Sequence, residues 1–248
     1  MPAEVTSTFL LADLEGSTQL LLELGPDYPD VLHGYRSLLG DSVVAAGGQV
    51  LATEGDGVFA VCPTASGALE AAVQVQRGLH AERWPKELEV RARIGIHVGI
   101  ASETPEGLVG LDVHRAARIM AAAHGGQILI SESVRSLVGD RIDGQDLGVL
   151  ELGEYLLRGL PRPERLYQVV APGLPAAFPP IRTMAPMRHN LPAQLTSFVG
   201  RAEEVAELAK LSRGARLVTV LGVGGTGKTR TALEVAGELV DELPNGVW

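Results

Sequence analysis

The chain has a single cysteine, Cys62, among its 248 residues, so it cannot form an internal disulfide bond. The disulfide framework that stabilises many small secreted proteins is therefore excluded, and a reducing compartment is the simpler interpretation. Cys62 lies in the apolar run 58–62, a setting that predicts a small buried side chain rather than a reactive thiol.

The sequence also lacks a targeting signal, a membrane-spanning run and a basic patch. Its first residues, MPAEVTST, have neither the basic start nor the apolar core of a signal peptide. No stretch approaches the roughly 18 consecutive apolar residues that a transmembrane helix needs. Lysine and arginine form no cluster, and the net charge of −9 argues against binding to a phosphate backbone. We therefore expect a cytoplasmic protein without membrane contact or direct nucleic-acid binding.

The composition, 46% hydrophobic and 21% charged, is that of an ordinary globular protein. Alternating apolar residues predict strands, and apolar residues at helical spacing predict helices. The expected strands are 5–12, 49–53, 58–62, 89–100, 127–130 and 166–170, and the expected helices are 19–24, 30–46, 65–79 and 112–123. Helices packed on one mainly antiparallel sheet in this order predict an α+β, ferredoxin-like fold.

A change of composition divides the chain. Residues 171–192 hold six of the fifteen prolines, which indicates an extended, semi-rigid linker. The predicted organisation is therefore a domain at 1–170, a Pro-rich linker at 171–192 and a second segment at 193–248. In this last segment we expect a helix at 203–211, a short strand at 217–221 and a helix at 229–242.

Two acidic residues and a small loop are the first group with chemistry. Asp13 ends the first expected strand, and Gly16, Ser17 and Thr18 follow at a helix N-terminus, where backbone N–H groups favour an anion and Ser17 or Thr18 is the expected N-cap. Asp56 lies in a hairpin turn. If the hairpin neighbours the first strand, the two carboxylates converge and hold Mg²⁺ or Mn²⁺. On spacing alone the alternative stays open that both are ordinary turn or helix-start residues.

Three segments in order carry a resemblance to a known family: 9–18 (FLLADLEGST), 53–59 (TEGDGVF) and 109–131 (VGLDVHRAARIMAAAHGGQILIS). Together they resemble the class III adenylate/guanylate cyclase catalytic domain over about residues 5–170. The resemblance implies a homodimer with active sites at the interface, which converts ATP or GTP to a 3′,5′-cyclic nucleotide and pyrophosphate. It also implies two Mg²⁺ or Mn²⁺ ions per site, held by Asp13, Asp56 and the backbone carbonyl of Leu14.

The same resemblance implies roles for three further residues. Arg118 matches the arginine that stabilises charge on the α-phosphate, although a solvated helix arginine is the plain alternative. His114 stands where the family has a ribose-orienting asparagine, and it lies on the same helix face as Arg118. Arg115 is off that face and is expected to be external. A solvated or core-packed His114 is an equal alternative. Arg158 is the candidate for the basic residue that holds the triphosphate.

The base-selecting positions depart from the family pattern. Ala52 stands where the family has a purine-selecting lysine, and Gly107 where adenylate-forming members have its partner carboxylate. Glu106 is the neighbouring acid and a substitute for that carboxylate after a small loop shift. The pattern predicts either a slow cyclase with relaxed base selectivity or a cyclase-like domain kept for nucleotide sensing or dimerisation.

A second motif lies near the end of the chain and satisfies G-x-x-x-x-G-K-[ST]. Its residues are Gly222, Gly224, Gly225, Gly227, Lys228 and Thr229. Residues 190–248 resemble the start of the P-loop signal-transduction ATPase module of large bacterial transcriptional regulators. The motif predicts that backbone amides and Lys228 bind phosphates and that Thr229 binds Mg²⁺. No Walker B strand follows, so we expect an incomplete α/β P-loop segment without ATPase activity of its own.

Overall fold

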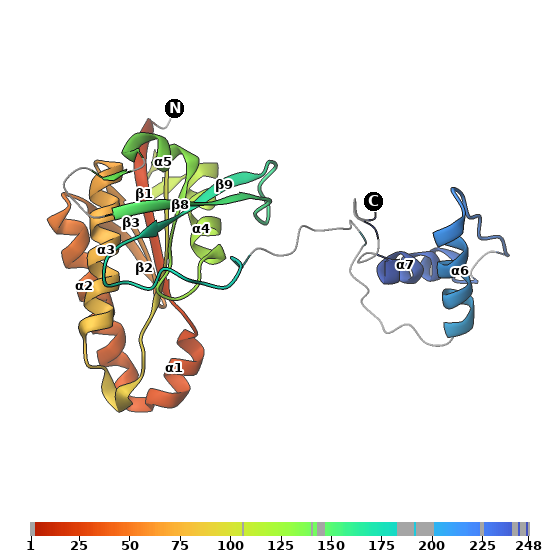
Figure 1. The fold of residues 1–248 in the computed structure, drawn as a ribbon, viewed down its shortest axis with the longest axis horizontal. Helices are drawn as coiled ribbons and strands as arrows, with labels where there is room; N and C mark the ends of the chain where they lie inside the picture. Colours follow the sequence, from red (N-terminus) through yellow and green to blue (C-terminus); the bar gives the residue numbers. More distant parts are fainter. Residues whose placement is uncertain are drawn as a thin grey trace. The chain divides into compact units, whose positions relative to one another are not determined.

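The computed structural model describes residues 3–105, 107–139, 141–142, 147–182, 191, 201–223, 226–239, 243 and 247. The chain divides into two compact units, Met1–Thr183 and Met184–Trp248. Figure 1 shows the helices and strands of both units.

The described residues of the first unit form a nine-stranded mixed sheet in the order β2-β3-β1-β4-β6-β9-β8-β7, with β5 paired to β4. The β1 strand is antiparallel to both β3 and β4, whereas β4 and β6 run parallel. The strands are β1 (Glu4–Leu14), β2 (Gln49–Glu54), β3 (Gly57–Cys62), β4 (Ala92–Thr104), β5 (Gly107–Val109), β6 (Ile128–Ser131), β7 (Arg141–Ile142), β8 (Leu147–Tyr155) and β9 (Glu164–Val170).

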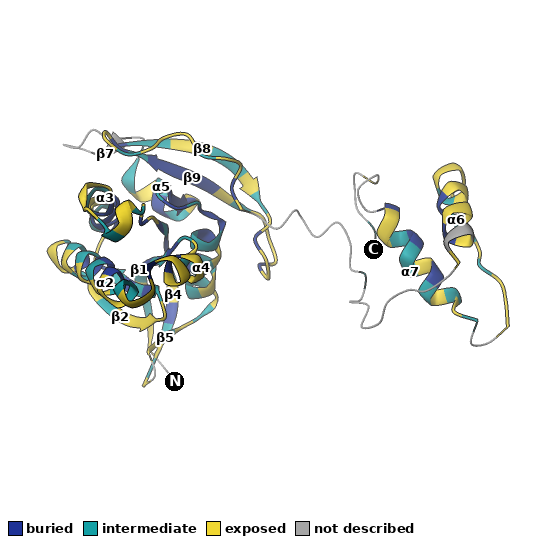
Figure 2. Cartoon of the chain, turned by 90° about the horizontal axis from the view of Figure 1, so that it is seen from below, coloured by how far each residue is buried: buried dark blue, intermediate teal, exposed yellow. Residues whose placement is uncertain are grey.

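Side chains alternate across the sheet and build a core on each face. Leu10 and Leu14 of β1 belong to the larger core, whose helices are α1 (Ser17–Leu24), α2 (Tyr28–Ala45), α3 (Ala65–Ala81) and α5 (Glu132–Val138). Phe9 points to the other face, where α4 (Leu111–Ala122) packs (Figure 2). Helix α4 lies so close to β4 that a Cβ atom on Gly95 would be 2.3 Å from the backbone nitrogen of Met120.

The sequence predicts most of the first unit to within a few residues. The expected α+β fold with helices on one sheet is confirmed, as is the hairpin of β2 and β3; the sheet, expected to be mainly antiparallel, is mixed because β4 and β6 run parallel. The expected strand at 89–100 is displaced and becomes β4, and helix α5 and strands β5, β7 and β8 were not expected. These missed elements are short or lie near the end of the unit, where apolar spacing gives little signal.

The first described part of the Pro-rich segment, residues 171–182, lies against the first unit, and we call it the strap. Gln168 donates a hydrogen bond to the Ala176 carbonyl oxygen at 2.8 Å, and Arg77 donates one to the Pro172 carbonyl oxygen at 3.2 Å. Ile181 is buried among side chains of β6, β9 and α4. The strap is therefore part of the packing of the first unit.

In the second unit, α6 (Ala202–Gly214) and α7 (Lys228–Leu239) pack through a small apolar cluster that includes Val205 and Val235. The predicted strand at 217–221 is wrong: residues 217–221 form no strand, and Leu217 and Leu221 are 83% and 87% exposed. A strand needs a neighbour for its backbone groups, and the described residues of this unit include no strand to pair with it.

Among the described residues, no helix combines the length and the apolar character needed to cross a membrane.

Candidate functional site: two converging carboxylates

The pairing of β1 with β3 brings two acidic residues to one place. Ala12 of β1 lies opposite Val58 of β3, so the turn that holds Asp56 is next to the end of β1. The Leu14 backbone N–H donates a hydrogen bond to Asp56 Oδ2 at 3.0 Å, and Arg36 of α2 donates one to the Gly55 carbonyl oxygen. Asp13 and Asp56 therefore converge, and the turn between β2 and β3 is fixed from two sides.

Arg93 of β4 holds the carboxylate of Asp13 from the neighbouring strand. Its Nε and Nη2 atoms lie 2.7 and 2.6 Å from Asp13 Oδ1 and Oδ2. Burial nevertheless raises the pKa of Asp13 above its ordinary value, and the negative charge of Asp56 adds to this effect against the lowering by Arg93. The sequence did not identify Arg93, because its position opposite Asp13 depends on the strand register.

Tyr35 of α2 has a polar atom without a partner beside this pair. The side chain is fully buried, and among the described residues its hydroxyl has no hydrogen-bond partner. Burial raises the pKa of Tyr35 far above its ordinary value, and the charges of Asp13 and Asp56 raise it further. A buried polar atom of this kind is unusual unless a ligand, ion or water satisfies it.

The donor chemistry of this site fits a hard divalent cation. Two carboxylates and the Leu14 carbonyl offer oxygen ligands, the type that Mg²⁺ and Mn²⁺ prefer. The described residues contain no group of three or more histidine, cysteine, aspartate or glutamate side chains that could hold a metal. An ion here would therefore need further oxygens from the backbone, water or a nucleotide.

Helix α1 begins at Ser17, three residues after Leu14. Gly16 is its N-cap and adopts a left-handed φ of 66°, which glycine tolerates without a steric cost. The prediction that Ser17 or Thr18 caps the helix is wrong: the helix begins at Ser17, and no side chain bonds its first turn. The N–H groups of this turn form the positive end of the helix dipole.

Helix α4 presents His114 and Arg118 to solvent. Both are exposed, and the described residues show no side-chain hydrogen bond or ion pair for either. Arg115, which was expected to be external, is half-buried. It forms an ion pair with Asp112 and another, at 3.0 Å, with Glu164 of β9. The expectation of an external Arg115 is therefore wrong, because the sequence does not reveal that β9 approaches α4.

A buried histidine joins the start of α4 to β4 and β6. His97 is 4% exposed; its Nδ1 lies 2.8 Å from Ser131 Oγ, and its Nε2 lies 3.5 Å from Asp112 Oδ1. Burial lowers the pKa of His97 to about 4, against the raising effect of Asp112. Asp112 also accepts a hydrogen bond from the Ile100 N–H at 2.7 Å. These contacts fix the orientation of the helix that carries His114 and Arg118.

Three further predicted residues lie on β2, on β5 and in the turn between β8 and β9. Ala52 is exposed on β2, and Gly107 begins β5; three strands, β3, β1 and β4, lie between β2 and β5 in the sheet. Arg158 is exposed in the turn between β8 and β9, and the described residues show no ion pair for it. Glu106, Gly224 and Gly225 lie outside the described residues.

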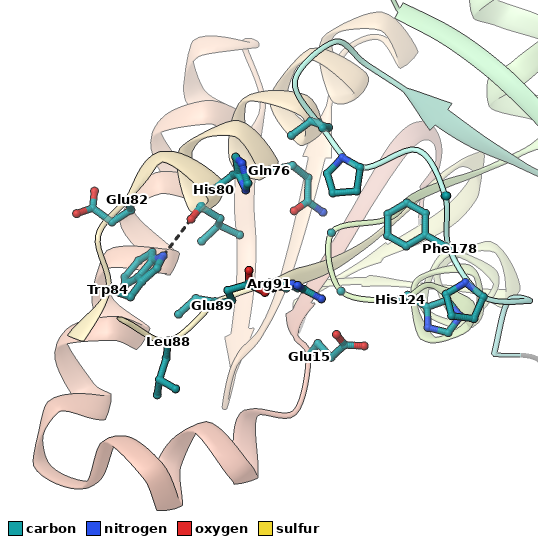
Figure 3. Close-up of a pocket in the computed structure, with 18 of the residues that line it drawn as sticks. Glu15, Gln76, His80, Glu82, Trp84, Leu88, Glu89, Arg91, His124 and Phe178 are labelled. Atoms are coloured by element: carbon teal, nitrogen blue, oxygen red, sulfur yellow. Dashed lines mark hydrogen bonds and ion pairs between the residues drawn. The ribbon is translucent and has the colours of Figure 1, made fainter. Parts of the chain in front are cut away.

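A large groove of about 1080 Å³ lies elsewhere, between the end of α3, the start of β4 and the strap (Figure 3). Trp84 and Phe178 are among the side chains at its edges. Glu15 contributes to the groove, but Asp13 and Asp56 do not. The groove is therefore distinct from the two-carboxylate site, although Glu15, which lines the groove, follows Asp13 and Leu14 in the sequence.

No family model matches the chain. It is 35% identical over 209 residues to an uncharacterized protein of Mycobacterium tuberculosis, an alignment that covers 83% of this chain and 70% of that protein. The chain belongs to the family of that protein. It is also 27% identical over 170 residues to a pH-sensitive adenylate cyclase of M. tuberculosis, with 68% of this chain and 42% of that enzyme covered.

The architecture matches that of solved cyclases. A Trypanosoma brucei adenylate cyclase in its monomeric state superposes with a TM-score of 0.64 and 24% identity, covering 72% of this chain and 95% of that one. The chain has the class III adenylate/guanylate cyclase catalytic-domain fold and is related to nucleotidyl cyclases. The resemblance read from the three sequence segments is confirmed at this level.

Proposed function

We propose that the first unit is a slow, metal-dependent nucleotidyl cyclase that converts ATP or GTP to a 3′,5′-cyclic nucleotide and pyrophosphate in intracellular signalling. The observation that carries this proposal is the convergence of Asp13 and Asp56 at the start of α1, tied by the hydrogen bond from Leu14 N–H to Asp56 Oδ2. The cyclase fold and the relationship to adenylate cyclases add support.

Asp13, Asp56 and the Leu14 carbonyl would hold two Mg²⁺ or Mn²⁺ ions. When bound, such ions offset triphosphate charge and lower the pKa of the attacking ribose 3′-hydroxyl. The first-turn amides at Gly16, Ser17 and Thr18 favour phosphate oxygens.

Cationic side chains complete the proposed site. Arg93, already beside Asp13, adds positive charge where the phosphates approach. We assign Arg118 to the charge that develops at the α-phosphate and His114 to a hydrogen bond that orients the ribose. Arg158 remains a proposed triphosphate ligand.

A second copy of the chain is part of the proposal. The sheet face beside α4 is covered less completely than the other: Leu11, Phe59 and Val61 are only partly buried, and Val109 and Leu111 are 49% and 51% exposed. His114 and Arg118 project to solvent from this side of the sheet. A homodimer packed through this face would cover the apolar side chains and let α4 of one copy complete the carboxylate site of the other.

The direct test is product formation by the full chain with Mn²⁺ and ATP or GTP. We expect cyclic nucleotide from the native chain and from the control Asp41→Ala, which removes an exposed acid from α2. We expect none from Asp56→Ala. Equal signals from the native chain and Asp56→Ala would contradict the enzyme proposal.

The shared site has its own test by mixing two inactive variants. Asp56→Ala and Arg118→Ala each disable both sites of their homodimer, but a mixed dimer has one site free of both changes. With random pairing, half of the dimers are mixed and each has one working site, so about a quarter of native activity should return. No recovery after subunit exchange would place all these residues in a site within one chain.

The second candidate is a regulatory, nucleotide-sensing domain without turnover, attached to a signalling ATPase or transcriptional regulator. It is favoured by Ala52 and Gly107, which offer no side-chain hydrogen bond to a base. The double change Ala52→Lys with Gly107→Asp should raise adenylate cyclase activity if these positions select the base. Flat activity, with nucleotide binding retained, would favour the sensing function.

We also propose a phosphate-binding loop in the second unit. Helix α7 begins at Lys228, the position that a P-loop requires, and Gly227 adopts a φ of 78°. Lys228 Nζ donates to the Val223 carbonyl oxygen at 2.8 Å, so its ammonium group lies over its own loop. Binding of a fluorescent ATP analogue that Lys228→Ala weakens, with Lys210→Ala as the control, would support the loop. Equal binding by both variants would contradict it.

A further inference from the structure

Arg182, at the end of the strap, binds three separate groups of the first unit. Its backbone N–H donates to the Ala122 carbonyl oxygen at 2.7 Å, at the end of α4. Its Nε donates to His124 Nδ1 at 3.2 Å, and its Nη2 forms an ion pair with Glu15 Oε1. One residue therefore joins the strap to the loop after α4 and to the turn after β1.

His124 is oriented for this contact. Since its Nδ1 accepts from Arg182, its Nε2 carries the proton and donates to the Pro180 carbonyl oxygen at 2.9 Å. The imidazole also stacks on Phe178 of the strap, with ring centroids 6.5 Å apart and planes at 9° (Figure 3). The imidazole thus contacts the strap through both nitrogens and one face.

Glu15 links Arg182 to the proposed metal site, because Glu15 directly follows Asp13 and Leu14 in the sequence. Its backbone N–H donates to the Arg91 carbonyl oxygen at 2.8 Å. Its carboxylate also accepts a hydrogen bond from the Gly125 amide. Gly125 is packed so closely that a Cβ atom there would lie 2.3 Å from Glu15 Oε2.

We propose that Arg182 is a positioning residue of the metal site and acts through Glu15. The ion pair holds Glu15 against the Gly125 amide, and this fixes the backbone on which Asp13 and Leu14 present their oxygens. The inference rests on the proposed function, since its consequence is the affinity of the carboxylate pair for a divalent cation. The strap is thereby part of the site, although Arg182 lies 167 residues from Glu15 in the sequence.

The experiment compares two arginines at opposite ends of the strap: Arg182, the last strap residue, and Arg77 of α3, which binds its start. Arg182→Ala removes the contact to Glu15, whereas Arg77→Ala removes only the hydrogen bond to the Pro172 carbonyl oxygen. Both full-length variants are assayed by hydrogen exchange of the peptide spanning residues 13–18 and by titration with Mn²⁺ alone, followed through the free-ion spin resonance signal.

We expect Arg182→Ala to speed exchange in residues 13–18 and to weaken Mn²⁺ binding by about fivefold, the scale of one ordinary hydrogen bond. Arg77→Ala should leave both measurements near native values. Arg182→Lys, which keeps the charge toward Glu15, should restore most of the Mn²⁺ affinity. Faster exchange confined to the strap, with native Mn²⁺ affinity, would overturn the inference.

The same data separate this inference from the proposed function. If the native chain binds no Mn²⁺, the metal-site proposal fails, and exchange in residues 13–18 alone decides whether Arg182 orders the turn. If the native chain binds Mn²⁺ and Arg182→Ala binds it equally well, only the role of Arg182 fails.

Discussion

Asp13 and Arg93 face each other across the β1–β4 pair, and the guanidinium of Arg93 bonds both oxygens of the Asp13 carboxylate at 2.7 and 2.6 Å. The planar fork of an arginine matches a carboxylate in this geometry. A divalent cation that binds Asp13 must share or displace this partner. Arg93 would therefore oppose such an ion electrostatically, whereas its charge would favour the phosphates of a nucleotide at the proposed site.

This opposition predicts two opposite effects for Arg93→Gln. At pH 8, above the ordinary titration range of a carboxyl group, Mn²⁺ should bind the nucleotide-free chain about three- to tenfold more tightly, because a neighbouring positive charge is gone. Cyclic nucleotide formation should fall, because the phosphates lose a cation. Mn²⁺ titration and product analysis measure the two effects.

Arg91→Gln is the control for that comparison, since Arg91 pairs with Glu89 at the surface and not with Asp13. It should leave Mn²⁺ affinity unchanged. Weaker Mn²⁺ binding by Arg93→Gln than by Arg91→Gln would show that Arg93 supports the ion instead of opposing it.

The carboxylate pair was predictable because its signals are local. Asp13 follows an alternating strand, Asp56 occupies a glycine-flanked hairpin turn, and only the adjacency of β1 and β3 had to be assumed. Arg93 lies 80 residues from Asp13, and its partner follows from the register of β1 against β4. Periodicity specifies which face a residue takes but not which residue lies opposite it.

The contacts of the strap were not predicted, and the predicted strand at 217–221 is wrong, for related reasons. Prolines mark a segment without regular structure, yet the contacts that dock residues 171–182 come from Phe178 and Arg182 with distant partners. Residues 217–221 have the composition of a strand, but a strand is stable only with a neighbour. In both cases the outcome depends on tertiary partners and not on local propensity.

Tyr35→Phe should stabilise the metal-free chain. The change removes a buried hydroxyl that has no hydrogen-bond partner among the described residues and keeps the ring that fills the core. Leaving such a group unsatisfied costs about 1–3 kcal/mol, so we expect a gain of about 1 kcal/mol in the free energy of unfolding. Urea denaturation in the presence of a chelator measures it.

Tyr155→Phe is the matched control, because its hydroxyl donates to the Leu152 carbonyl oxygen at 3.0 Å. Here the same chemical change breaks a hydrogen bond and should lower stability by about 0.5–1.5 kcal/mol. A loss of stability in Tyr35→Phe similar to that in Tyr155→Phe would mean that the Tyr35 hydroxyl has a partner after all.

Gly95→Ala should destabilise the first unit by about 2–3 kcal/mol or more, since overpacking forces the backbone of α4 away from β4. The added Cβ would lie 2.3 Å from the Met120 nitrogen and 2.6 Å from its Cα, and neither atom can rotate away. Thermal unfolding gives the change in stability.

Gly40→Ala is the matched control, because the same substitution is made where the added Cβ has open space. Gly40 lies inside α2, and a Cβ there would meet nothing within 4 Å. Because alanine is the better helix former, stability should rise by about 0.5–1 kcal/mol. If both glycine variants were equally stable, the close approach of α4 to β4 would be wrong.

The lowered pKa of His97 predicts the direction in which the free energy of unfolding changes with pH. Its pKa is about 4 in the folded chain, because it is buried, against an ordinary value of 6.5. As the pH falls below 6.5, the unfolded chain takes up a proton that the folded chain does not, so the free energy of unfolding falls. Between pH 7.5 and pH 5.0 this single residue should remove about 2 kcal/mol, and the loss levels off near pH 4.

Comparing His97→Gln with His33→Gln isolates that contribution. Glutamine at 97 does not titrate, so the stability difference between pH 7.5 and pH 5.0, from urea denaturation, should shrink by about 2 kcal/mol. His33 is exposed on α2, and its replacement should leave the native pH dependence intact. The groups facing His97, Asp112, Ser131 and Ser133, are the same in both variants. Because the pKa of Asp13 is raised in the folded chain, its protonation raises stability as the pH falls, and it does so equally in each protein. An unchanged pH dependence in His97→Gln would therefore mean that His97 is charged in the folded chain.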